Sequence, residues 1–563
     1  MGSKKVAENF TRAGNVNFNG NFCPVLQDKK FRYGTAGFRY PNEEMTFIAF
    51  RIGFLASLRA RSLNQVVGVM VTASHNPTGD NGVKIIEPTG HMLENDWEHL
   101  ATELVNANDT EFEELASSTE KSIMEKTGLK TETIPDNAKI FIGSDTRDSS
   151  PWLMRAVARG AEFGRVLKVN EFVNFTTPQL HYIVYATNKP NLSFDRLAPV
   201  RKTTDAFFEF IKRCPSKQLE NYKPSLIVDC ANGVGALWVL EYLNHPEQKN
   251  FPMNITLKND AKDAAANEYL NRDCGADFVK LWRTFPRGFK NVPSETRCAA
   301  LDGDADRLVY FYSNNNGVFI LLDGDQIAAL YAKFLIKQLE LLGAKDLSIG
   351  VVQTAYANGN SSRYFRSLGI EPAIVATGVK NLHPKSETYD IGIYFEANGH
   401  GTVTFSEKFW DFVKETPADP EPKIMLRLFS QIINDIVGDG IADLFAVEAI
   451  LRYFDWSIGD WASKIYTDVP SAQLKIPFRD RSIFQTTPDE TRLIKPEVMQ
   501  KEIDVWVSKF HGARAFVRPS GTEPIVRIYA EADTDENALH LAYRIAHVVD
   551  KNYPIPFELP EIE

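Results

Sequence analysis

VVGVMVTASHNPTGDNG, residues 66–82, joins an apolar run to a loop that is rich in turn-forming residues. The run is suited to a buried strand, and the loop would hold its polar side chains at the end of that strand. Further apolar runs of strand length recur along the chain, at 139–143, 225–230, 308–312, 348–354 and 390–396. Segments with helical spacing of apolar residues, such as 325–343, lie between many of them. Strands that alternate with helices predict an α/β fold with a mainly parallel sheet.

The chain has 563 residues, too many for a single core, and an ordinary globular composition with 44% hydrophobic and 24% charged residues. Its net charge of −10 gives no electrostatic footprint for nucleic acid or an anionic membrane, so an anionic ligand requires a local basic cluster. The five cysteines contain no C-x-x-C pair and predict reduced, buried thiols. No apolar signal core is present at the start, and the stretch around Arg51 is too short for a bilayer. We therefore expect a soluble, cytoplasmic protein.

Ser74 stands beside His75 in the first loop, which raises the question of whether the histidine activates the serine. Neighbouring side chains of an extended segment point to opposite faces, so such a pair seldom forms a hydrogen bond. Asn76, Asn81 and Lys84 add polar donors around the hydroxyl, which is a setting suited to a phosphate. The simpler alternative is that Ser74 only caps a turn.

The loop LDGDADR, residues 301–307, carries three carboxylates at alternate positions, those of Asp302, Asp304 and Asp306. These groups would repel one another unless a cation lay among them, and all-oxygen ligands suit Mg²⁺. An EF-hand is excluded because Arg307 stands where that loop needs glycine. A solvated acidic turn is the alternative, which the apolar run directly after the loop disfavours.

A third loop, RPSGTEPIVRIYAEA at 518–532, combines basic side chains with hydroxyls and a close backbone approach. The groups that suit phosphate oxygens are those of Arg518, Ser520, Gly521, Thr522 and Arg527. A plain β-turn with surface arginines is the alternative.

A fourth loop, YFEANGHGTV at 394–403, follows an apolar run and carries Glu396, Asn398 and His400. Ligands of α/β sheets usually bind where strands end, and Glu396 and Asn398 would share a face of an extended chain. The pair suits the vicinal hydroxyls of a sugar, although a glutamate satisfied within its own turn is also common.

Together the four loops resemble those of the α-D-phosphohexomutase superfamily, whose members carry TASHNP, DGDADR, a sugar loop of this type and RPSGTEP. The resemblance extends from FRYGTAGFR at 31–39 to the C-terminal loop, which is nearly the whole chain. Asn398, where many relatives carry serine, and the early position of TASHNP resemble the phosphoacetylglucosamine mutase branch.

The resemblance implies three related α/β domains with mixed sheets and a C-terminal α+β domain around a central cleft. The predicted domains carry the serine loop, the metal loop, the sugar loop and the phosphate loop, at 1–190, 191–308, 309–455 and 456–563 respectively.

It also implies an intramolecular phosphotransferase of the isomerase class. Such an enzyme interconverts N-acetylglucosamine 6-phosphate and N-acetylglucosamine 1-phosphate and feeds UDP-N-acetylglucosamine synthesis. In the family, the serine that matches Ser74 is phosphorylated and donates its phosphoryl group, so N-acetylglucosamine 1,6-bisphosphate is the intermediate or activator. Mg²⁺ would bind Asp302, Asp304, Asp306 and an oxygen of Ser74.

Residue roles carry over by position. The catalytic set would be Ser74, Lys84, Arg39 and His75, with Lys84 as the first candidate for proton transfer. The substrate-binding set would be Arg307, Thr377, Gly378, Glu396, Asn398, His400, Arg518, Ser520, Gly521, Thr522 and Arg527. The expected partners are small sugar phosphates, not nucleic acid or membrane, and the expected state is a monomer.

Two rival functions are compatible with these loops. A metal-dependent sugar-phosphate phosphatase would release free phosphate, but its D-x-D motif is followed by a small hydroxyl residue, whereas Arg307 follows Asp306 here. A non-catalytic sugar-phosphate-binding regulator would need no phosphorylatable serine.

Overall fold

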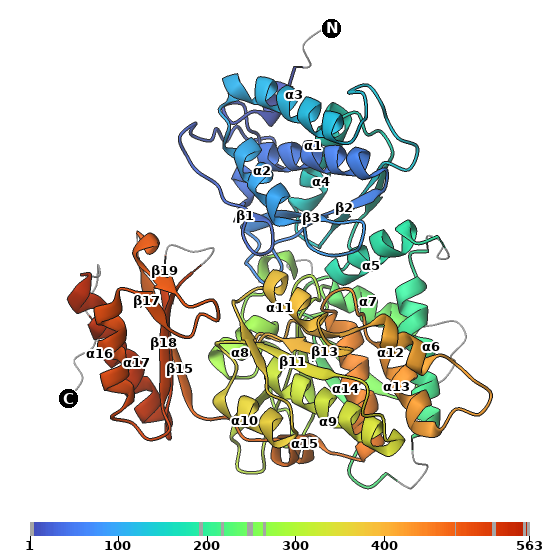
Figure 1. Cartoon of the computed structure of the whole chain (residues 1–563), viewed down its shortest axis with the longest axis vertical. Helices are drawn as coiled ribbons and strands as arrows, with labels where there is room; N and C mark the ends of the chain where they lie inside the picture. The colour runs from blue at the N-terminus through green and yellow to red at the C-terminus, as the bar shows by residue number, and fades with distance from the viewer. Residues whose placement is uncertain are drawn as a thin grey trace. The chain divides into compact units, whose positions relative to one another are not determined.

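The computed structural model describes residues 5–190, 195–214, 219–244, 251–262, 266–478, 480–520, 525–554 and 559. The chain divides into two compact units. The first is formed by Met1–Leu321 and Leu428–Asp455, and the second by Leu322–Arg427 and Trp456–Glu563. Figure 1 labels many of their helices and strands. Over the described ranges, no helix is long and apolar enough to cross a membrane.

The first unit begins with a five-stranded sheet in the order β1-β3-β2-β4-β5. Its strands are β1 (Phe38–Pro41), β2 (Val66–Val71), β3 (Asp80–Ile86), β4 (Lys139–Ser144) and β5 (Val169–Phe172). β2, β4 and β5 are parallel, whereas β3 runs antiparallel to both β1 and β2. Only residues 72–79 separate β2 from β3, which is too short for a crossover connection, so the two strands form an antiparallel pair. The TASHNP loop is this short connection.

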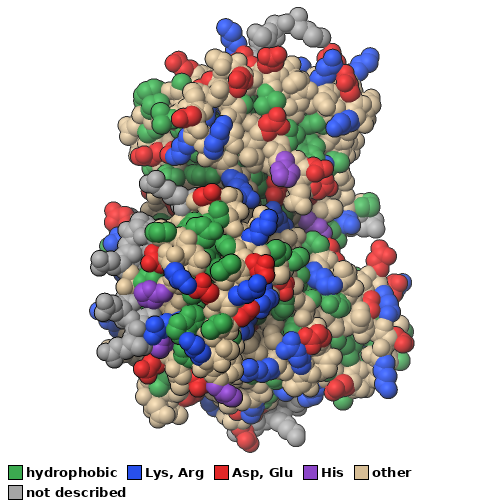
Figure 2. Space-filling view, turned by 60° about the vertical axis from the view of Figure 1, so that its left-hand side comes forward, with side chains coloured by type: hydrophobic (Ala, Val, Ile, Leu, Met, Phe, Trp, Pro, Cys, Tyr) green, Lys and Arg blue, Asp and Glu red, His purple; other side chains and the backbone are tan. Residues whose placement is uncertain are grey.

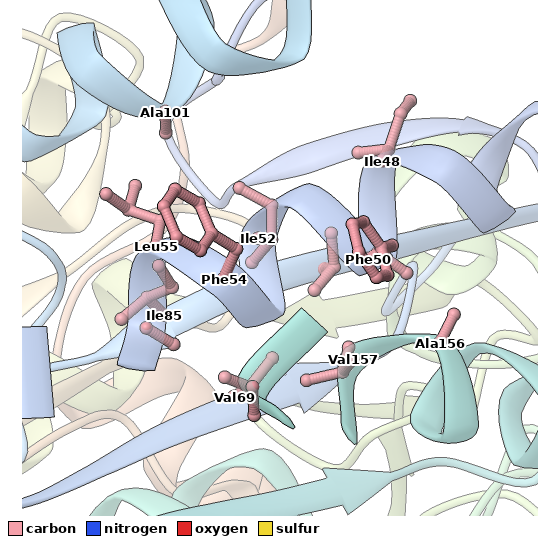
Figure 3. Close-up of a cluster of buried hydrophobic side chains, with 14 of the residues drawn as sticks. Ile48, Phe50, Ile52, Phe54, Leu55, Val69, Ile85, Ala101, Ala156 and Val157 are labelled. Atoms are coloured by element: carbon pink, nitrogen blue, oxygen red, sulfur yellow. The ribbon is translucent and has the colours of Figure 1, made fainter. Parts of the chain in front are cut away.

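Helices α1 and α4 cover this sheet and supply much of its core, shown in Figure 3. In that cluster, Phe54 of α1, Val69 of β2 and Val157 of α4 are all buried. The two helix backbones are so close that a Cβ added at Gly160 would lie 1.8 Å from the carbonyl oxygen of Phe50. Helix α1 contains the apolar stretch around Arg51 and is a core helix of the first unit.

The helices of the first unit are α1 (Met45–Leu63), α2 (Asn95–Asn106), α3 (Asp109–Lys126), α4 (Ser150–Phe163), α5 (Thr177–Asn188), α6 (Ala198–Arg213), α7 (Gly235–Leu243), α8 (Ala276–Trp282) and α14 (Gly440–Phe454). Its short 3₁₀ helices are η1 (Glu8–Phe10), η2 (Asn42–Glu44) and η3 (Ala266–Tyr269).

A second five-stranded sheet of this unit has the order β10-β9-β8-β6-β7. Its strands are β6 (Ser225–Asp229), β7 (Asn254–Lys258), β8 (Cys298–Leu301), β9 (Leu308–Ser313) and β10 (Phe319–Leu322). β6, β7 and β8 are parallel, and β9 pairs with β8 in the antiparallel sense across the aspartate loop. The predicted boundary between residues 308 and 309 therefore lies at the start of a strand of this sheet. The division into four domains stays a prediction.

The second unit contains a four-stranded sheet in the order β12-β11-β13-β14. Its strands are β11 (Ile349–Thr354), β12 (Ala373–Val375), β13 (Ile391–Phe395) and β14 (Gly401–Phe405). The first three are parallel, and β14 is antiparallel to β13. The sugar loop is the turn between β13 and β14.

C-terminal to this sheet, the second unit is α+β. An antiparallel sheet has the order β15-β19-β18, and β16 pairs with β17. These strands are β15 (Ser471–Pro477), β16 (Gln485–Thr486), β17 (Leu493–Lys495), β18 (Arg514–Pro519) and β19 (Ile525–Glu531). The helices of the unit are α9 (Gly324–Leu342), α10 (Gly359–Ser367), α11 (Val379–Ser386), α12 (Glu407–Val413), α15 (Ile458–Lys464), η4 (Arg481–Ile483), α16 (Glu497–Val507) and α17 (Asp535–Asn552). Helix α13 (Glu421–Ile432) contains the point where the chain passes back to the first unit.

The cysteines and the surface charges also bear on the expectations from the sequence. All five cysteines are free thiols, and four are buried, but Cys23 is partly exposed and the prediction is wrong there. On the face shown in Figure 2, basic and acidic side chains are interspersed among the described residues. A phosphate ligand therefore depends on individual basic side chains such as those described next.

Candidate active site

Ser74 lies in the short loop between β2 and β3 and is 2% exposed. Its backbone is left-handed, with φ of 51°, and its N–H donates a hydrogen bond of 2.8 Å to Oγ1 of Thr72. This conformation is uncommon for serine and needs support from its surroundings. The loop therefore fixes the direction of the Ser74 hydroxyl.

Arg147, which the sequence did not single out, holds this loop in place. Its guanidinium donates to backbone carbonyl oxygens along the loop at 2.6–3.1 Å, those of Ser74, Asn76, Pro77 and Asp80. Its Nε is 2.9 Å from Oδ2 of Asp145, and the whole side chain is only 1% exposed. Arg147 follows β4, which is parallel to β2, so the loops after these strands lie at the same sheet edge. The stretch SDTRDSS directly after the apolar run at 139–143 was the signal that could have identified it.

Asn271 also holds the serine loop, and the sequence did not single it out either. Its side-chain amide donates to the carbonyl oxygens of Ser74 at 2.8 Å and Asn76 at 3.2 Å.

The aspartate loop lies directly against the Ser74 hydroxyl. Ser74 Oγ donates to Asp302 Oδ2 at 2.7 Å, and Thr177 Oγ1 donates to Asp304 Oδ2 at 2.6 Å. The other oxygen of Asp302 accepts the backbone N–H groups of Asp306 and Arg307. These bonds fix the loop between β8 and β9 with its carboxylates directed toward the serine.

Asp302, Asp304 and Asp306 are buried, and one carboxylate oxygen from each lies within 4.8 Å of the others. Burial, and secondarily the charge of the neighbouring carboxylates, raises the pKa of Asp302 and of Asp304. Asp304 Oδ1 is buried without a hydrogen-bond partner among the described residues. Three converging oxygen ligands, one of them with an unused acceptor, fit a hard divalent cation such as Mg²⁺.

His75 lies farther from the serine hydroxyl than Asp302 does. Its Nδ1 is 3.5 Å from Ser74 Oγ, compared with 2.7 Å for Asp302 Oδ2. Burial, together with the charge of Arg307, lowers the pKa of His75 to about 3, so the ring is neutral at physiological pH. The Ser74 proton is therefore directed to Asp302.

Two arginines complete the basic side of this cluster. Arg307 Nη1 forms an ion pair of 2.5 Å with Asp277 Oδ1, and Asp277 Oδ2 is 3.6 Å from Nε2 of His75. Arg39 of β1 donates to Asn76 Oδ1 at 3.2 Å. Burial, followed by the charge of Arg307, lowers the pKa of Arg39. Asp277 was not predicted from the sequence, because it lies apart from every motif.

Lys84 lies on β3 opposite Met70 and is 5% exposed. Its charge is among the influences that act to lower the pKa of Asp304, so the ammonium lies near the aspartate loop. The first unit therefore brings together all the predicted catalytic and metal-binding residues and Arg307.

The sugar loop forms a tight turn in the second unit. Glu396 N–H donates to the carbonyl of His400 at 2.9 Å, and His400 N–H donates to Asn398 Oδ1 at 2.9 Å. Asn398 Nδ2 lies 3.4 Å from Glu396 Oε2, and Gly378 N–H donates to Glu396 Oε1 at 3.2 Å. The turn therefore links to the start of α11, where Thr377 and Gly378 lie.

Arg518 joins the same cluster through Thr377. Arg518 Nη1 donates to Thr377 Oγ1 at 3.0 Å, and Nη2 is 3.2 Å from Oε1 of Glu490, another residue that the sequence did not single out. Arg527 lies opposite Arg518 on the neighbouring strand β19. Ser520 is buried, and its N–H donates to the carbonyl of Ile525 at 3.0 Å.

The predicted residues Gly521 and Thr522 lie outside the described residues. The other predicted substrate-binding residues of the second unit are described. Among them Thr377, Gly378, Glu396, Asn398, His400 and Arg518 form one connected set.

Models of known families match four segments of the chain. The matches are Phosphoglucomutase/phosphomannomutase, alpha/beta/alpha domain I (residues 55–112), Phosphoacetylglucosamine mutase AMG1, domain II (199–309), Phosphoacetylglucosamine mutase AMG1, domain III (323–456) and Phosphoglucomutase/phosphomannomutase, C-terminal domain (488–548).

Curated relatives match over most of their length. The phosphoacetylglucosamine mutase of Candida albicans is 41% identical over 550 residues, which cover 93% of this chain and 97% of the relative. That of Homo sapiens is 41% identical over 528 residues, covering 92% and 93%.

Solved structures agree with these matches. A crystal structure of N-acetylglucosamine-phosphate mutase in the substrate complex matches with a TM-score of 0.86 and 40% identity, covering 93% of this chain and 97% of that one. The Aspergillus fumigatus N-acetylphosphoglucosamine mutase in complex with GlcNAc-6P and magnesium matches with a TM-score of 0.85 and 38% identity, covering 93% and 96%. These structures confirm the predicted α/β fold with mixed sheets. The chain belongs to the phosphoacetylglucosamine mutase family of the α-D-phosphohexomutase superfamily.

Proposed function

We propose that the chain interconverts N-acetylglucosamine 6-phosphate and N-acetylglucosamine 1-phosphate and so supplies UDP-N-acetylglucosamine synthesis. One observation carries the assignment of the reacting group. The Ser74 hydroxyl lies 2.7 Å from a buried carboxylate of the aspartate loop, and the left-handed backbone of Ser74 fixes its direction. A hydroxyl that only capped a turn would need no such partner.

The phosphoryl group moves in two half-reactions. Phospho-Ser74 gives its phosphoryl group to the free hydroxyl of the sugar phosphate, so that the P–O bond to the serine breaks and a P–O bond to the sugar forms. The hydroxyl proton passes to a nearby base, for which Lys84 in its neutral form is the candidate. The resulting N-acetylglucosamine 1,6-bisphosphate returns its other phosphoryl group to Ser74, and the proton goes back to the newly freed sugar hydroxyl.

Positioning and neutralisation of charge carry most of the catalysis in such transfers. Asp302, Asp304, Asp306 and an oxygen of Ser74 would hold Mg²⁺, which when bound supplies Lewis-acid stabilisation of phosphoryl charge. Arg307 and Arg39 contribute fixed positive charge, and neutral His75 can donate one hydrogen bond to the phosphoryl group. Arg147 and Asn271 keep the serine loop in the orientation that the transfer requires.

Binding of the sugar phosphate is assigned to the second unit. Glu396 and Asn398 would hold sugar hydroxyls, with His400, Thr377 and Gly378 beside them. Arg518, Ser520, Gly521, Thr522 and Arg527 would hold the phosphate that does not react. We further propose a monomeric, cytoplasmic enzyme whose partners are small sugar phosphates, not nucleic acid or membrane.

The test combines mass spectrometry with a mutase assay. Purified protein incubated with a hexose 1,6-bisphosphate should gain the mass of one phosphoryl group, and Ser74→Ala should neither gain it nor turn over, although it should still show a cooperative thermal unfolding transition. N-acetylglucosamine 6-phosphate should be a better substrate than glucose 6-phosphate. Near-normal turnover by Ser74→Ala, or release of free phosphate in place of an isomeric sugar phosphate, would contradict the proposal.

A further inference from the structure

Glu490 lies in the turn between β16 and β17 of the second unit, with a left-handed φ of 59°. The turn is held by other groups: Glu490 N–H donates to the carbonyl of Thr487 at 2.9 Å, and Asp489 Oδ1 accepts from the Thr487 hydroxyl and, at 3.2 Å, from Thr491 N–H. The Glu490 carboxylate takes no part in these bonds. Its side chain is therefore available for another purpose.

That carboxylate binds two residues of the predicted substrate site. Its Oε2 accepts hydrogen bonds from Thr377 N–H at 3.0 Å and from the Thr377 hydroxyl at 2.8 Å. Its Oε1 is 3.2 Å from Nη2 of Arg518. The Arg518 side chain is 10% exposed and that of Glu490 is 17% exposed, so water screens the interaction little.

The three groups bound by Glu490 are of the kinds that bind phosphate in proteins. They are a backbone N–H just before the first turn of α11, a hydroxyl and a guanidinium, each of which donates to anionic oxygens in phosphate sites. A phosphate that used these three donors would need its oxygens near the places where the Glu490 oxygens now lie. A backbone N–H has one proton to give, and so has a hydroxyl, so Thr377 cannot bind a substrate oxygen while it donates to Glu490.

We propose that Glu490 is an internal competitor of the substrate, which must displace its carboxylate from Thr377 and Arg518 in order to bind there. The inference rests on the proposed function, in which these two residues bind the sugar phosphate. Its consequence is that Glu490 weakens binding of the substrate and so sets its KM. A carboxylate left between Thr377 and Arg518 would also repel a phosphate, so the substrate must displace Glu490 from both residues.

Glu490→Gln tests this, because it removes the charge and keeps the shape. The matched control is Glu497→Gln on α16, whose carboxylate is 74% exposed and pairs only with Lys501 among the contacts described. Affinity for inorganic phosphate and for N-acetylglucosamine 6-phosphate would be measured by calorimetry, KM and kcat by mutase assay, and folding by thermal unfolding. We expect Glu490→Gln to bind both ligands about tenfold more tightly, with a lower KM, because a neutral amide holds Thr377 and Arg518 less strongly than the carboxylate does. Glu497→Gln should match the wild type.

An unchanged or raised KM in correctly folded Glu490→Gln would overturn the inference, since the carboxylate would then be neutral to binding or needed for it. Arg518→Ala, made in both the wild type and the Glu490→Gln background, separates this failure from that of the proposed site. If Arg518→Ala raises KM while Glu490→Gln does not lower it, the phosphate site stands and the competition does not. If Arg518→Ala changes KM in neither background, the phosphate site itself is elsewhere, and the inference fails with it.

Discussion

The carboxylate of Asp304 has an oxygen that a bound cation would satisfy. It is fully buried, accepts one hydrogen bond from Thr177, and has its other oxygen directed to no described donor. Because burial raises the pKa of Asp302 and Asp304 above that of the unfolded chain, ionising them costs stability as the pH rises through the unfolded value of about 4. A divalent cation bound by these carboxylates would offset this cost at neutral pH.

We expect Asp304→Asn to lower the affinity for Mg²⁺ and to lower activity at limiting Mg²⁺, with partial recovery when Mg²⁺ is raised. Asparagine keeps an acceptor for Thr177 but loses a charged ligand. Chelation should inactivate the wild type, and Ca²⁺ should bind but support little transfer, because its longer and looser coordination suits the transfer poorly. The measurements are activity against metal concentration and the rise in Tm at pH 7 on adding Mg²⁺, which should be smaller for the variant. Full activity in the presence of chelator would show that this loop does not bind a catalytic metal.

The elements that place these residues were predicted unevenly. Each of the six apolar runs forms a strand, because a continuous buried run is visible in the sequence by itself. The antiparallel strands β1, β3 and β14 were not predicted, since polar and glycine residues interrupt them. The three aspartates were found because they are neighbours in one loop. By contrast, Arg147 contacts Ser74, which lies 73 positions away in the sequence, and Glu490 contacts Thr377, which lies 113 positions away. Such contacts depend on strand order, which the local pattern does not contain.

The crossing of α1 and α4 is the element-scale feature most open to test. Gly53 and Gly160 allow these helices to touch, since a Cβ at either position would lie within 2.0 Å of a backbone carbonyl oxygen of the other helix. We expect Gly160→Ala to lower the free energy of unfolding by about 3 kcal/mol, because backbone cannot yield as a flexible side chain would. Urea unfolding measures this. Gly79→Ala, where nothing lies within 4 Å of the added Cβ, serves as the control and should leave stability unchanged. Equal stability of the two variants would show that the helices can separate without cost.

At the scale of the whole molecule, the chain returns to its first unit after it has built the third sheet. Helix α14, at 440–454, belongs to that unit and contacts α6 and the strands β8 and β9 of the second sheet. Its Glu448 is completely buried and forms an ion pair of 2.8 Å with Arg297, while the hydroxyls of Tyr222 and Tyr310 donate to the same carboxylate at 3.0 and 3.1 Å. No sequence motif marks this return, because Glu448 lies 151 residues from Arg297 and 138 residues from Tyr310 in the sequence. A helix from late in the sequence thus packs against the second sheet, which carries the aspartate loop.

We expect Glu448→Gln to destabilise the first unit by about 3–5 kcal/mol, because it leaves the Arg297 guanidinium buried without its counter-charge. Glu209→Gln is the control, since that carboxylate is 40% exposed and pairs with Arg213 on the surface of α6. Hydrogen exchange followed by mass spectrometry should show loss of protection in β6, β8 and β9 together with α14, because the buried pair and its tyrosine partners lie in these elements or shortly before them. The antiparallel sheet formed by β15, β18 and β19 should keep its protection, since that sheet belongs to the second unit. Loss of protection in both units to the same degree would show that they unfold as one body, and the late segment would then stabilise the entire chain.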